Sequence, residues 1–285
     1  MKKITKIAAL VLATATIAAS MSACVSKSTS STASTAASSG VASSVAAQTS
    51  IDKIKANGTV TMSTNAEFEP FEYKDGGNFA GIDIEISQKI ADKLGVKLKI
   101  NDVAFDSLVA ELQSGKANFV AAGMTATDDR KKNVDFSDAY FKAAQAIIVP
   151  KGSSIKSPKD LAGKVVGVQQ GTTGDSYCTD EDKTNNVNVK TVKRYNKGVD
   201  AVTDLIGGRL DAVVIDDFPA QKFVSKNADK IVKLSDALTV EEYAIAVKKG
   251  DTEMLKTVND VLAQMKSDGS LDKLVTKFKS ALEGE

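Results

Sequence analysis

The sequence predicts an α/β fold with two lobes. Short runs of β-branched and apolar residues alternate with segments whose apolar residues recur at helical spacing, from residue 54 onward. This alternation occurs in the first half of the chain and again in the second, and 285 residues suffice for two lobes of common domain size. Such alternation indicates mostly parallel sheets, in which ligands bind beyond the carboxyl ends of strands.

The first half follows the order βαβαβ. Apolar residues share one face of the segment 82–94, and Gly95 is a typical helix stop. Gly115 closes a second helix in the same way. We therefore expect strands at 59–63, 96–100 and 119–122, and helices at 82–94 and 108–113.

The second half repeats the pattern. We expect strands at 164–168, 189–195 and 212–215, and helices that start at Pro158, follow the turn 171–174 and span 201–206. Two further β-type runs, 146–149 and 243–247, flank this block. The tail, 252–266 and 271–279, is amphipathic helix that returns to the first lobe.

Composition and charge exclude several classes of function. The chain is 42% hydrophobic and 26% charged, which is typical of a globular protein. Lys and Arg number 37 against 36 Asp and Glu, so no basic footprint indicates nucleic acid. The absence of His removes Ser-His-Asp and Cys-His nucleophile systems and the commonest zinc ligand. We expect no catalytic residue, cofactor or metal.

The N-terminus is typical of an export signal. Three lysines within the first six residues precede an apolar stretch, 7–19, that is too short to span a bilayer. The sequence Met-Ser-Ala-Cys at 21–24 resembles a bacterial lipoprotein box, which implies a signal peptide over 1–23 and lipidation of Cys24; a plain secretory signal is the alternative. Residues 25–50 are rich in Ser, Thr and Ala and read as a tether. Cys178 is then unpaired, and we expect it to be a small packing residue.

One loop carries the strongest functional signal. The sequence Ala-Gly-Met-Thr-Ala-Thr-Asp-Asp-Arg at 122–130 follows a buried strand, and Thr127 is a typical helix cap. Arg130 then lies at a helix start, where anions are preferred, and binding of an anionic group would explain it. The loop resembles the Ala-Gly-Met-Thr-x-Thr-x-x-Arg signature of the extracellular solute-binding proteins, family 3, which capture amino acids for ABC importers. The resemblance is continuous from residue 60 to 279.

The resemblance implies the two-lobed periplasmic-binding-protein fold of type II, with two mixed sheets flanked by helices and joined by a two-strand hinge. It implies a first lobe of residues 51–144 plus 244–285 and a second lobe of residues 145–243. The runs 146–149 and 243–247 would be the paired crossover strands of the hinge.

The resemblance also implies a set of ligand-binding residues: Asn65, Phe68, Phe105, Gly123, Met124, Thr125, Arg130, Gln170, Thr172, Thr173 and Asp216. Arg130 would clamp the ligand's α-carboxylate, which Thr125 would contact through its N–H and hydroxyl. The Gly123 carbonyl would accept from the α-ammonium. The alternatives are that Arg130 pairs with Asp128 or Asp129, and that Gly123 only provides a turn conformation.

In the second lobe, the loop 170–174 would turn N–H groups at a helix N-terminus toward the carboxylate. Asp216, directly after a predicted strand, would pair with the α-ammonium. Its neighbour Asp217 could take that role instead, or Asp216 could simply cap the next helix.

Phe68 and Phe105 would cover the ligand's side chain, with core packing as the alternative for each. Phe71 is expected in the core. Asn65 stands where binders of basic amino acids and glutamine have an acidic residue, so this position gives no support for a cationic side chain. We expect a polar amino acid as ligand.

We therefore expect a monomeric, lipid-anchored protein on the outer face of the bacterial cell membrane that delivers a free amino acid to ABC permease subunits. One rival is an enzyme on the same fold, similar to the cyclohexadienyl or arogenate dehydratases. The other is a sensor subunit that binds the same ligand and signals through a partner.

Overall fold

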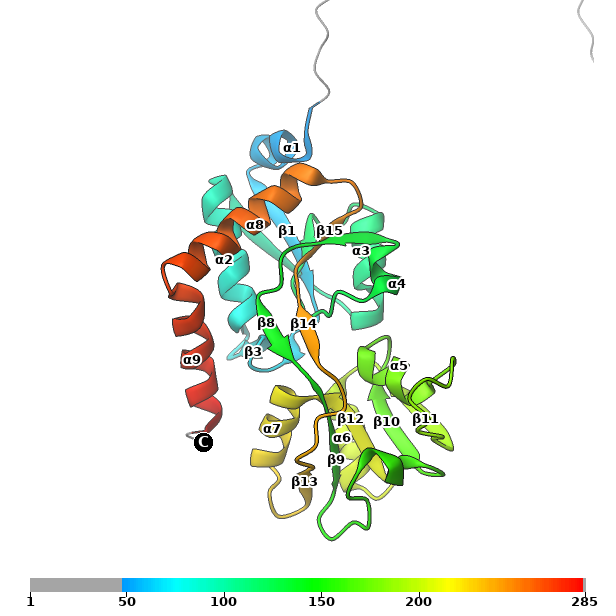
Figure 1. Ribbon diagram of the computed structural model, residues 1–285. Coiled ribbons are helices and arrows are strands. Elements are labelled where there is room, and N and C mark those ends of the chain that lie inside the picture. The colour runs from blue at the N-terminus through cyan, green and yellow to red at the C-terminus, as the bar shows by residue number, and fades with distance from the viewer. Residues whose placement is uncertain (1–47, 284–285) are drawn as a thin grey trace, which may run out of the picture. The chain divides into compact units, whose positions relative to one another are not determined.

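The computed structural model describes residues 48–283, which belong to one compact unit (Figure 1). The expected signal peptide, Cys24 and nearly all of the expected tether lie outside the described residues. The first described helix is α1 (Ser50–Asn57), which has Thr49 as its N-cap. None of the described helices is both long enough and apolar enough to cross a bilayer.

The first sheet has the strand order β5-β1-β6-β15-β7. Its parallel part consists of β1 (Thr59–Thr64), β5 (Lys97–Asp102) and β6 (Phe119–Val120). The strand β15 (Ala246–Lys248) runs antiparallel to β6 and to β7 (Val134–Phe136). The sheet is therefore mixed, and its fourth strand comes from near the end of the chain.

The second sheet has the order β11-β10-β12-β9-β13. Here β10 (Val165–Gln169), β11 (Thr191–Tyr195) and β12 (Ala212–Asp216) are parallel. The strand β9 (Gln145–Pro150) runs antiparallel to β12 and to β13 (Ile231–Lys233). Both sheets thus place the first strand of a βαβαβ unit between the other two.

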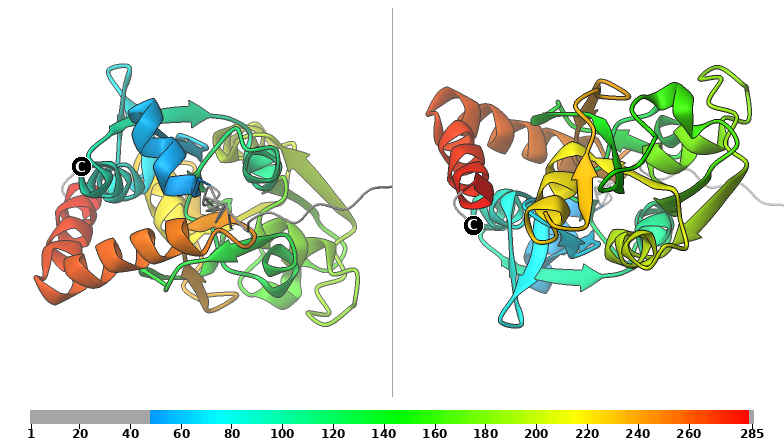
Figure 2. Two further views of the ribbon diagram at one scale, coloured as in Figure 1. Left: turned by 90° about the horizontal axis from the view of Figure 1, so that it is seen from above. Right: turned by 90° about the horizontal axis from the view of Figure 1, so that it is seen from below.

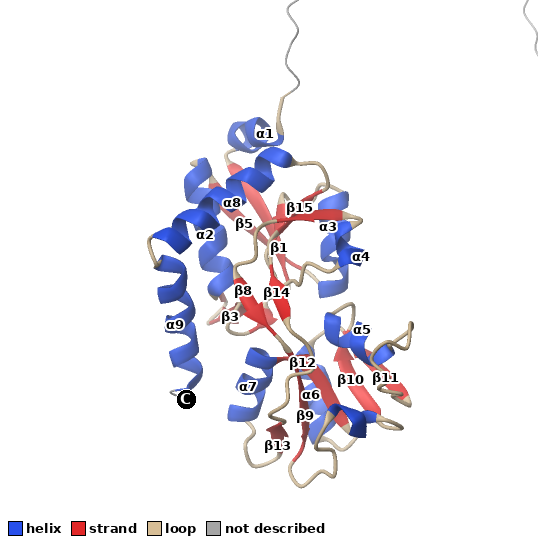
Figure 3. Cartoon of the chain, viewed as in Figure 1, coloured by secondary structure: helices blue, strands red, loops and turns tan. Residues whose placement is uncertain are grey.

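Helices cover both sheets (Figure 3). The lobe built on the first sheet, lobe one, contains α1, α2 (Ile82–Leu94), α3 (Leu108–Gln113), α4 (Asp128–Lys131) and α8 (Thr252–Ser267). The predicted helix over 82–94 is confirmed, with three isoleucines fully buried and Gly95 as a left-handed C-cap. Figure 2 shows α8 beside α1, which it contacts.

The lobe built on the second sheet, lobe two, contains α5 (Thr173–Thr179), α6 (Gly198–Ile206) and α7 (Asp217–Ser225). The last helix, α9 (Ser270–Glu283), contacts α8 of lobe one and α7 of lobe two. A small three-stranded sheet, β2 (Glu67–Phe68), β3 (Glu72–Asp75) and β4 (Asn78–Ala80), follows β1. Two short 3₁₀ helices cover Phe105–Ser107 and Pro158–Leu161.

Two strands join the lobes, but they are not the predicted pair. The crossover strands are β8 (Phe141–Ala143) and β14 (Glu241–Tyr243), which pair antiparallel. Residues 146–149 lie inside β9 and pair with β12 and β13, while β15 pairs within the first sheet. The predicted pairing was wrong because 146–149 is a buried strand of the second sheet, and the run 243–247 is divided between the end of β14 at Tyr243 and the start of β15 in the first sheet.

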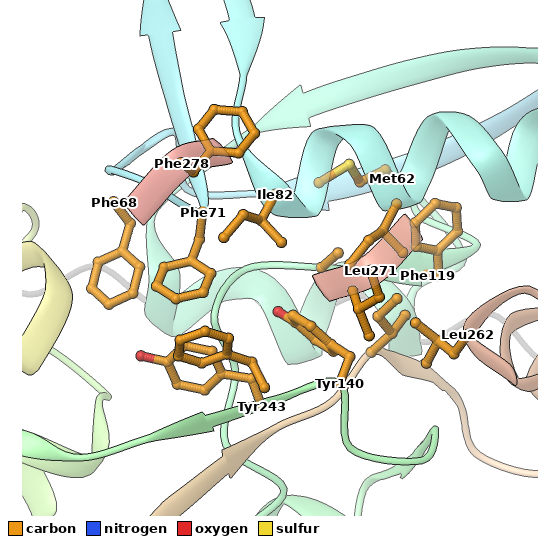
Figure 4. Close-up of a cluster of buried hydrophobic side chains, with 14 of the residues drawn as sticks. Met62, Phe68, Phe71, Ile82, Phe119, Tyr140, Tyr243, Leu262, Leu271 and Phe278 are labelled. Atoms are coloured by element: carbon orange, nitrogen blue, oxygen red, sulfur yellow. The ribbon is translucent and has the colours of Figure 1, made fainter. Parts of the chain in front are cut away.

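An aromatic cluster lies beside the hinge. The Phe71 ring centroid is 4.8 Å from that of Phe141, 5.0 Å from that of Tyr243 and 6.3 Å from that of Phe218. Figure 4 shows Phe71 and Tyr243 within the larger buried cluster. The core role expected for Phe71 is confirmed. Cys178 is also buried, and burial raises the pKa of its thiol to about 12, which fits the predicted packing role.

Candidate functional site

A small cavity lies where the carboxyl ends of parallel strands from both lobes meet. Its volume is about 10 Å³, room for about one water molecule. It is lined by Phe68, Phe105, Gly123, Thr125, Arg130, Gln169, Thr172, Thr173 and Asp216. Eight of these nine were predicted from the sequence. Because an amino acid is much larger than a water molecule, its entry requires the walls to move apart.

Arg130 reaches from lobe one to lobe two. Thr127 caps α4, as predicted, by accepting from the Arg130 backbone N–H at 3.2 Å. The Arg130 guanidinium donates to the Thr125 carbonyl at 2.8 Å and to the Gly171 carbonyl at 2.9 Å, and lies 5.2 Å from the Phe105 ring centroid. Burial lowers the pKa of this guanidinium, and the charges of Asp216 and Glu241 oppose the shift.

The acidic residues on α4 have other partners than Arg130. Asp128 forms an ion pair with Lys131 at 3.1 Å, and Asp129 forms one with Lys132 at 2.5 Å. The surface pairing considered for Arg130 is therefore not observed in the structure.

Asp216 faces the same cavity from the end of β12. It occupies the N-cap position of α7, yet its side chain forms no capping hydrogen bond and accepts from the Tyr243 hydroxyl at 2.5 Å. Burial, and next the charge of Glu241, raise the pKa of Asp216 to about 7, against the hydrogen bond from Tyr243. Asp217 forms an ion pair with Lys233 instead. Of the two neighbouring carboxylates, Asp216 is the one that lines the cavity.

The loop between β6 and α4, residues 121–127, is called the Gly123 loop, and the buried carboxyl group of Asp83 binds its backbone. The Gly123 N–H donates to Asp83 at 2.8 Å, and the Tyr140 hydroxyl donates to the other oxygen of Asp83 at 2.7 Å. Burial raises the pKa of Asp83 to about 6, while these two hydrogen bonds oppose the shift. Gly123 has a φ of +51°, and a Cβ there would lie 2.8 Å from the Phe68 ring. The position needs glycine for both reasons.

Three predicted residues do not line the cavity. Asn65 donates to the Val103 carbonyl and accepts from the Gln169 side chain at 2.8 Å, so both ends of its amide are engaged. Met124 is buried in the core of lobe one, because alternate residues after β6 point away from the cleft. The Gln170 side chain donates to Asp106 at 2.7 Å on the exposed rim.

Two residues were missed by the sequence analysis. Gln169, the last residue of β10, lines the cavity, and its position at a strand end was the available signal. Glu241 begins β14, and its carboxylate accepts from the hydroxyls of Thr125 at 2.6 Å and of Thr173 at 2.8 Å. Both threonines also line a groove of about 740 Å³ that Glu241 faces. No local pattern in the sequence marks Glu241.

Several direct contacts join the lobes around the cavity. Besides the Arg130 and Asn65 contacts, Lys197 of lobe two forms an ion pair with Glu67 of lobe one. Any separation of the walls has to break these contacts. Within residues 48–283, no group of three or more Cys, Asp or Glu side chains is arranged to hold a metal ion.

Comparison with known proteins assigns the family. The model of the bacterial extracellular solute-binding proteins, family 3, matches residues 60–281. The arginine-binding extracellular protein ArtP of Bacillus subtilis is 36% identical over 218 residues, which cover 76% of this chain and 84% of ArtP. The L-cystine-binding protein TcyJ of Escherichia coli is 32% identical over 234 residues, which cover 81% of this chain and 86% of TcyJ.

Solved structures agree with this assignment. A mutant of ArgBP from T. maritima is 44% identical with a TM-score of 0.76, over 81% of this chain and 99% of that one. The ancestral amino-acid-binding protein AncCDT-1, described as a precursor of cyclohexadienyl dehydratase, is 38% identical with a TM-score of 0.72, over 80% and 98%. With the two mixed sheets, the two-strand hinge and the shared cavity, these matches show that the chain belongs to the bacterial extracellular solute-binding proteins, family 3.

Proposed function

We propose that this protein binds a free amino acid, with arginine as the first candidate, between its two lobes and delivers it to the permease of an ABC importer. The observation that carries the proposal is that Arg130 of lobe one and Asp216 of lobe two line the same small cavity. A free amino acid carries one charge of each sign a few ångströms apart, which matches this pair.

Arg130 would bind the α-carboxylate. A guanidinium has five N–H donors, and two of them are used by the Thr125 and Gly171 carbonyls. Three remain for a ligand, enough for a paired hydrogen bond to a carboxylate. The N-terminus of α5, capped by Thr172, lies on the same cavity and adds backbone N–H groups.

Asp216 would bind the α-ammonium. It is buried and interacts with the Tyr243 hydroxyl and the Gln145 side chain, and a carboxylate has enough lone pairs to accept from a ligand ammonium as well. Phe68 and Phe105 line the cavity with aromatic surface and would contact the aliphatic part of the ligand's side chain.

The names of the relatives support arginine first. ArtP and ArgBP are named for arginine binding, and TcyJ is named for cystine. Both ligands implied by these names, arginine and cystine, carry an α-carboxylate and an α-ammonium, so the anchoring pair described above serves either of them.

We propose binding without turnover. The relatives that support this are named as binding proteins, and AncCDT-1 is itself described as an amino-acid-binding protein. The test is to incubate the protein with prephenate and with arogenate and to follow product by chromatography. Product formation at a catalytic rate would establish the dehydratase alternative.

We further propose that residues 1–23 are a signal peptide and that lipidated Cys24 holds a monomer on the outer face of the bacterial cell membrane. The lipoprotein box at 21–24 supports this. Labelled palmitate should be incorporated by the wild type and not by Cys24→Ala, and sedimentation should give a monomer. Equal labelling of both chains would contradict the anchor.

The test of the anchoring pair is titration calorimetry with three related ligands. L-Arginine should bind, whereas agmatine lacks the carboxylate and argininic acid has a hydroxyl in place of the ammonium. Loss of one charged partner in a buried pair is expected to weaken binding by about 2–5 kcal/mol, roughly 30-fold or more. If agmatine and argininic acid bind as tightly as arginine, the pair does not anchor the ligand. If none of the twenty amino acids binds, the proposed function fails.

A further inference from the structure

Glu241 is a buried carboxylate held by both lobes and by the hinge. It begins β14, and a backbone bridge between Thr125 and Tyr243 fixes this strand against the Gly123 loop. One carboxylate oxygen accepts from Thr125 of lobe one and from Thr173 of lobe two, and the other accepts from Thr239 at 2.8 Å. All three hydrogen bonds come from neutral hydroxyls.

These contacts change what the two threonines of the cavity offer to a ligand. A hydroxyl has one hydrogen to donate and two lone pairs. Because Thr125 and Thr173 donate their hydrogens to Glu241, their oxygens face the cavity as acceptors only. Thr173 already accepts from the Gln145 side chain at 3.0 Å, which leaves one lone pair. The hydroxyls therefore suit N–H groups of a ligand better than carboxylate oxygens.

The charges around the cavity are not balanced. Of the described residues that line it, Arg130 is the only cation. Asp216 lines the cavity as well, and the buried carboxylate of Glu241, which is hydrogen-bonded to the lining residues Thr125 and Thr173, adds a second negative charge that acts on Arg130. A zwitterionic ligand with a neutral side chain would leave the excess negative charge in place, and an acidic side chain would increase it. A cationic side chain would compensate it.

We propose that Glu241 is a specificity-determining residue that gives the cleft its preference for amino acids with a positively charged side chain. The charge of Glu241 supplies the excess negative charge around the cavity. Its hydrogen bonds leave the Thr125 and Thr173 hydroxyls as acceptors only. The raised pKa of Asp216, to which the charge of Glu241 contributes, is consistent with this excess. The inference rests on the proposed function, because it assigns the ligand class of the same site.

The test compares L-arginine with L-citrulline, which has nearly the same shape and a neutral ureido group. Glu241→Gln removes the charge at nearly constant volume, and Glu242→Gln is the matched control, because Glu242 is the exposed next residue on the same strand. Calorimetry at pH 8 gives the ratio of the citrulline and arginine dissociation constants. We expect this ratio to fall about tenfold in Glu241→Gln and to stay unchanged in Glu242→Gln.

An unchanged ratio in Glu241→Gln, with arginine still bound, would overturn the inference and leave the proposed function intact. If the wild type binds no amino acid, the proposed function itself fails. A second test uses the wild type alone and so does not depend on the folding of the variant. The wild type should bind lysine at least tenfold more tightly than norleucine, and glutamine more tightly than glutamate. Equal affinities within each pair would also overturn the inference.

Discussion

Binding should depend on pH through Asp216. Its pKa is about 7 because burial and the charge of Glu241 disfavour its ionised form. An α-ammonium needs the ionised carboxylate and stabilises it, so ligand binding should lower this pKa and release a proton. Affinity should therefore rise with pH through the range around 7 and level off above it.

The size of the effect follows from the ionised fraction of Asp216. With a pKa of about 7, roughly one molecule in eleven is ionised at pH 6 and roughly ten in eleven at pH 8. The apparent dissociation constant equals the intrinsic one divided by this fraction, so binding at pH 8 should be about tenfold tighter than at pH 6. That ratio corresponds to about 1.4 kcal/mol. Near pH 7, about half a proton should leave per ligand bound.

Titration calorimetry at pH 6, 7 and 8 measures both quantities, since runs in two buffers with different ionisation enthalpies give the number of protons released. Asp216→Asn is the control, because it keeps the volume and cannot ionise. It should bind more weakly and lose the pH dependence. Wild-type affinities that agree within twofold at pH 6 and 8, with no proton released, would refute the assignment of Asp216 to the ammonium.

Three further predictions concern single residues. Arg130→Ala should weaken binding by about 2–5 kcal/mol with the melting temperature nearly unchanged; calorimetry that finds equal affinity would remove Arg130 from the site. Gly123→Ala should destabilise the fold by about 1–2 kcal/mol and lower the melting temperature by several degrees, since φ is +51° and the new Cβ meets Phe68; an equal melting temperature would show that the loop relaxes. Glu72 is buried beside Asp83, and burial, then the charges of Asp83 and Asp216, hold its pKa well above the ordinary value. As pH rises, the unfolded chain binds fewer protons than the folded one, so the stability of the wild type should decline. The free energy of unfolding of Glu72→Gln, measured with urea, should therefore rise relative to that of the wild type by at least about 1 kcal/mol between pH 5 and 8. A difference that stays constant over this range would contradict the prediction.

The sequence was most informative where local rules apply. The helix over 82–94, its Gly95 stop and the Thr127 cap depend on residues within a few positions of each other, and all three are present. The positions of Arg130 and Asp216 followed from strand ends and from a family signature. Both residues line the cavity, because residues beyond the carboxyl ends of parallel strands converge.

Contacts across the hinge could not be predicted in this way. Glu241 meets Thr125 across 116 positions of sequence, and the contact exists only because β14 lies against the Gly123 loop. The apolar run 243–247 gave no sign that it is divided, with β14 ending at Tyr243 and β15 beginning at Ala246. A buried run lacks the alternation that would mark where a chain leaves one sheet and enters another.

The order of strands in the first sheet has a consequence for when lobe one can fold. The strand β15 lies between β6 and β7, although those two strands precede all of lobe two in the chain. Until residues 246–248 are available, β7 has no partner that connects it to β5, β1 and β6. Lobe two, in contrast, is encoded in one uninterrupted segment from β9 to β13. A chain that is synthesised or exported from its N-terminus can therefore complete the second sheet first, and the first sheet only after nearly all of the polypeptide has emerged.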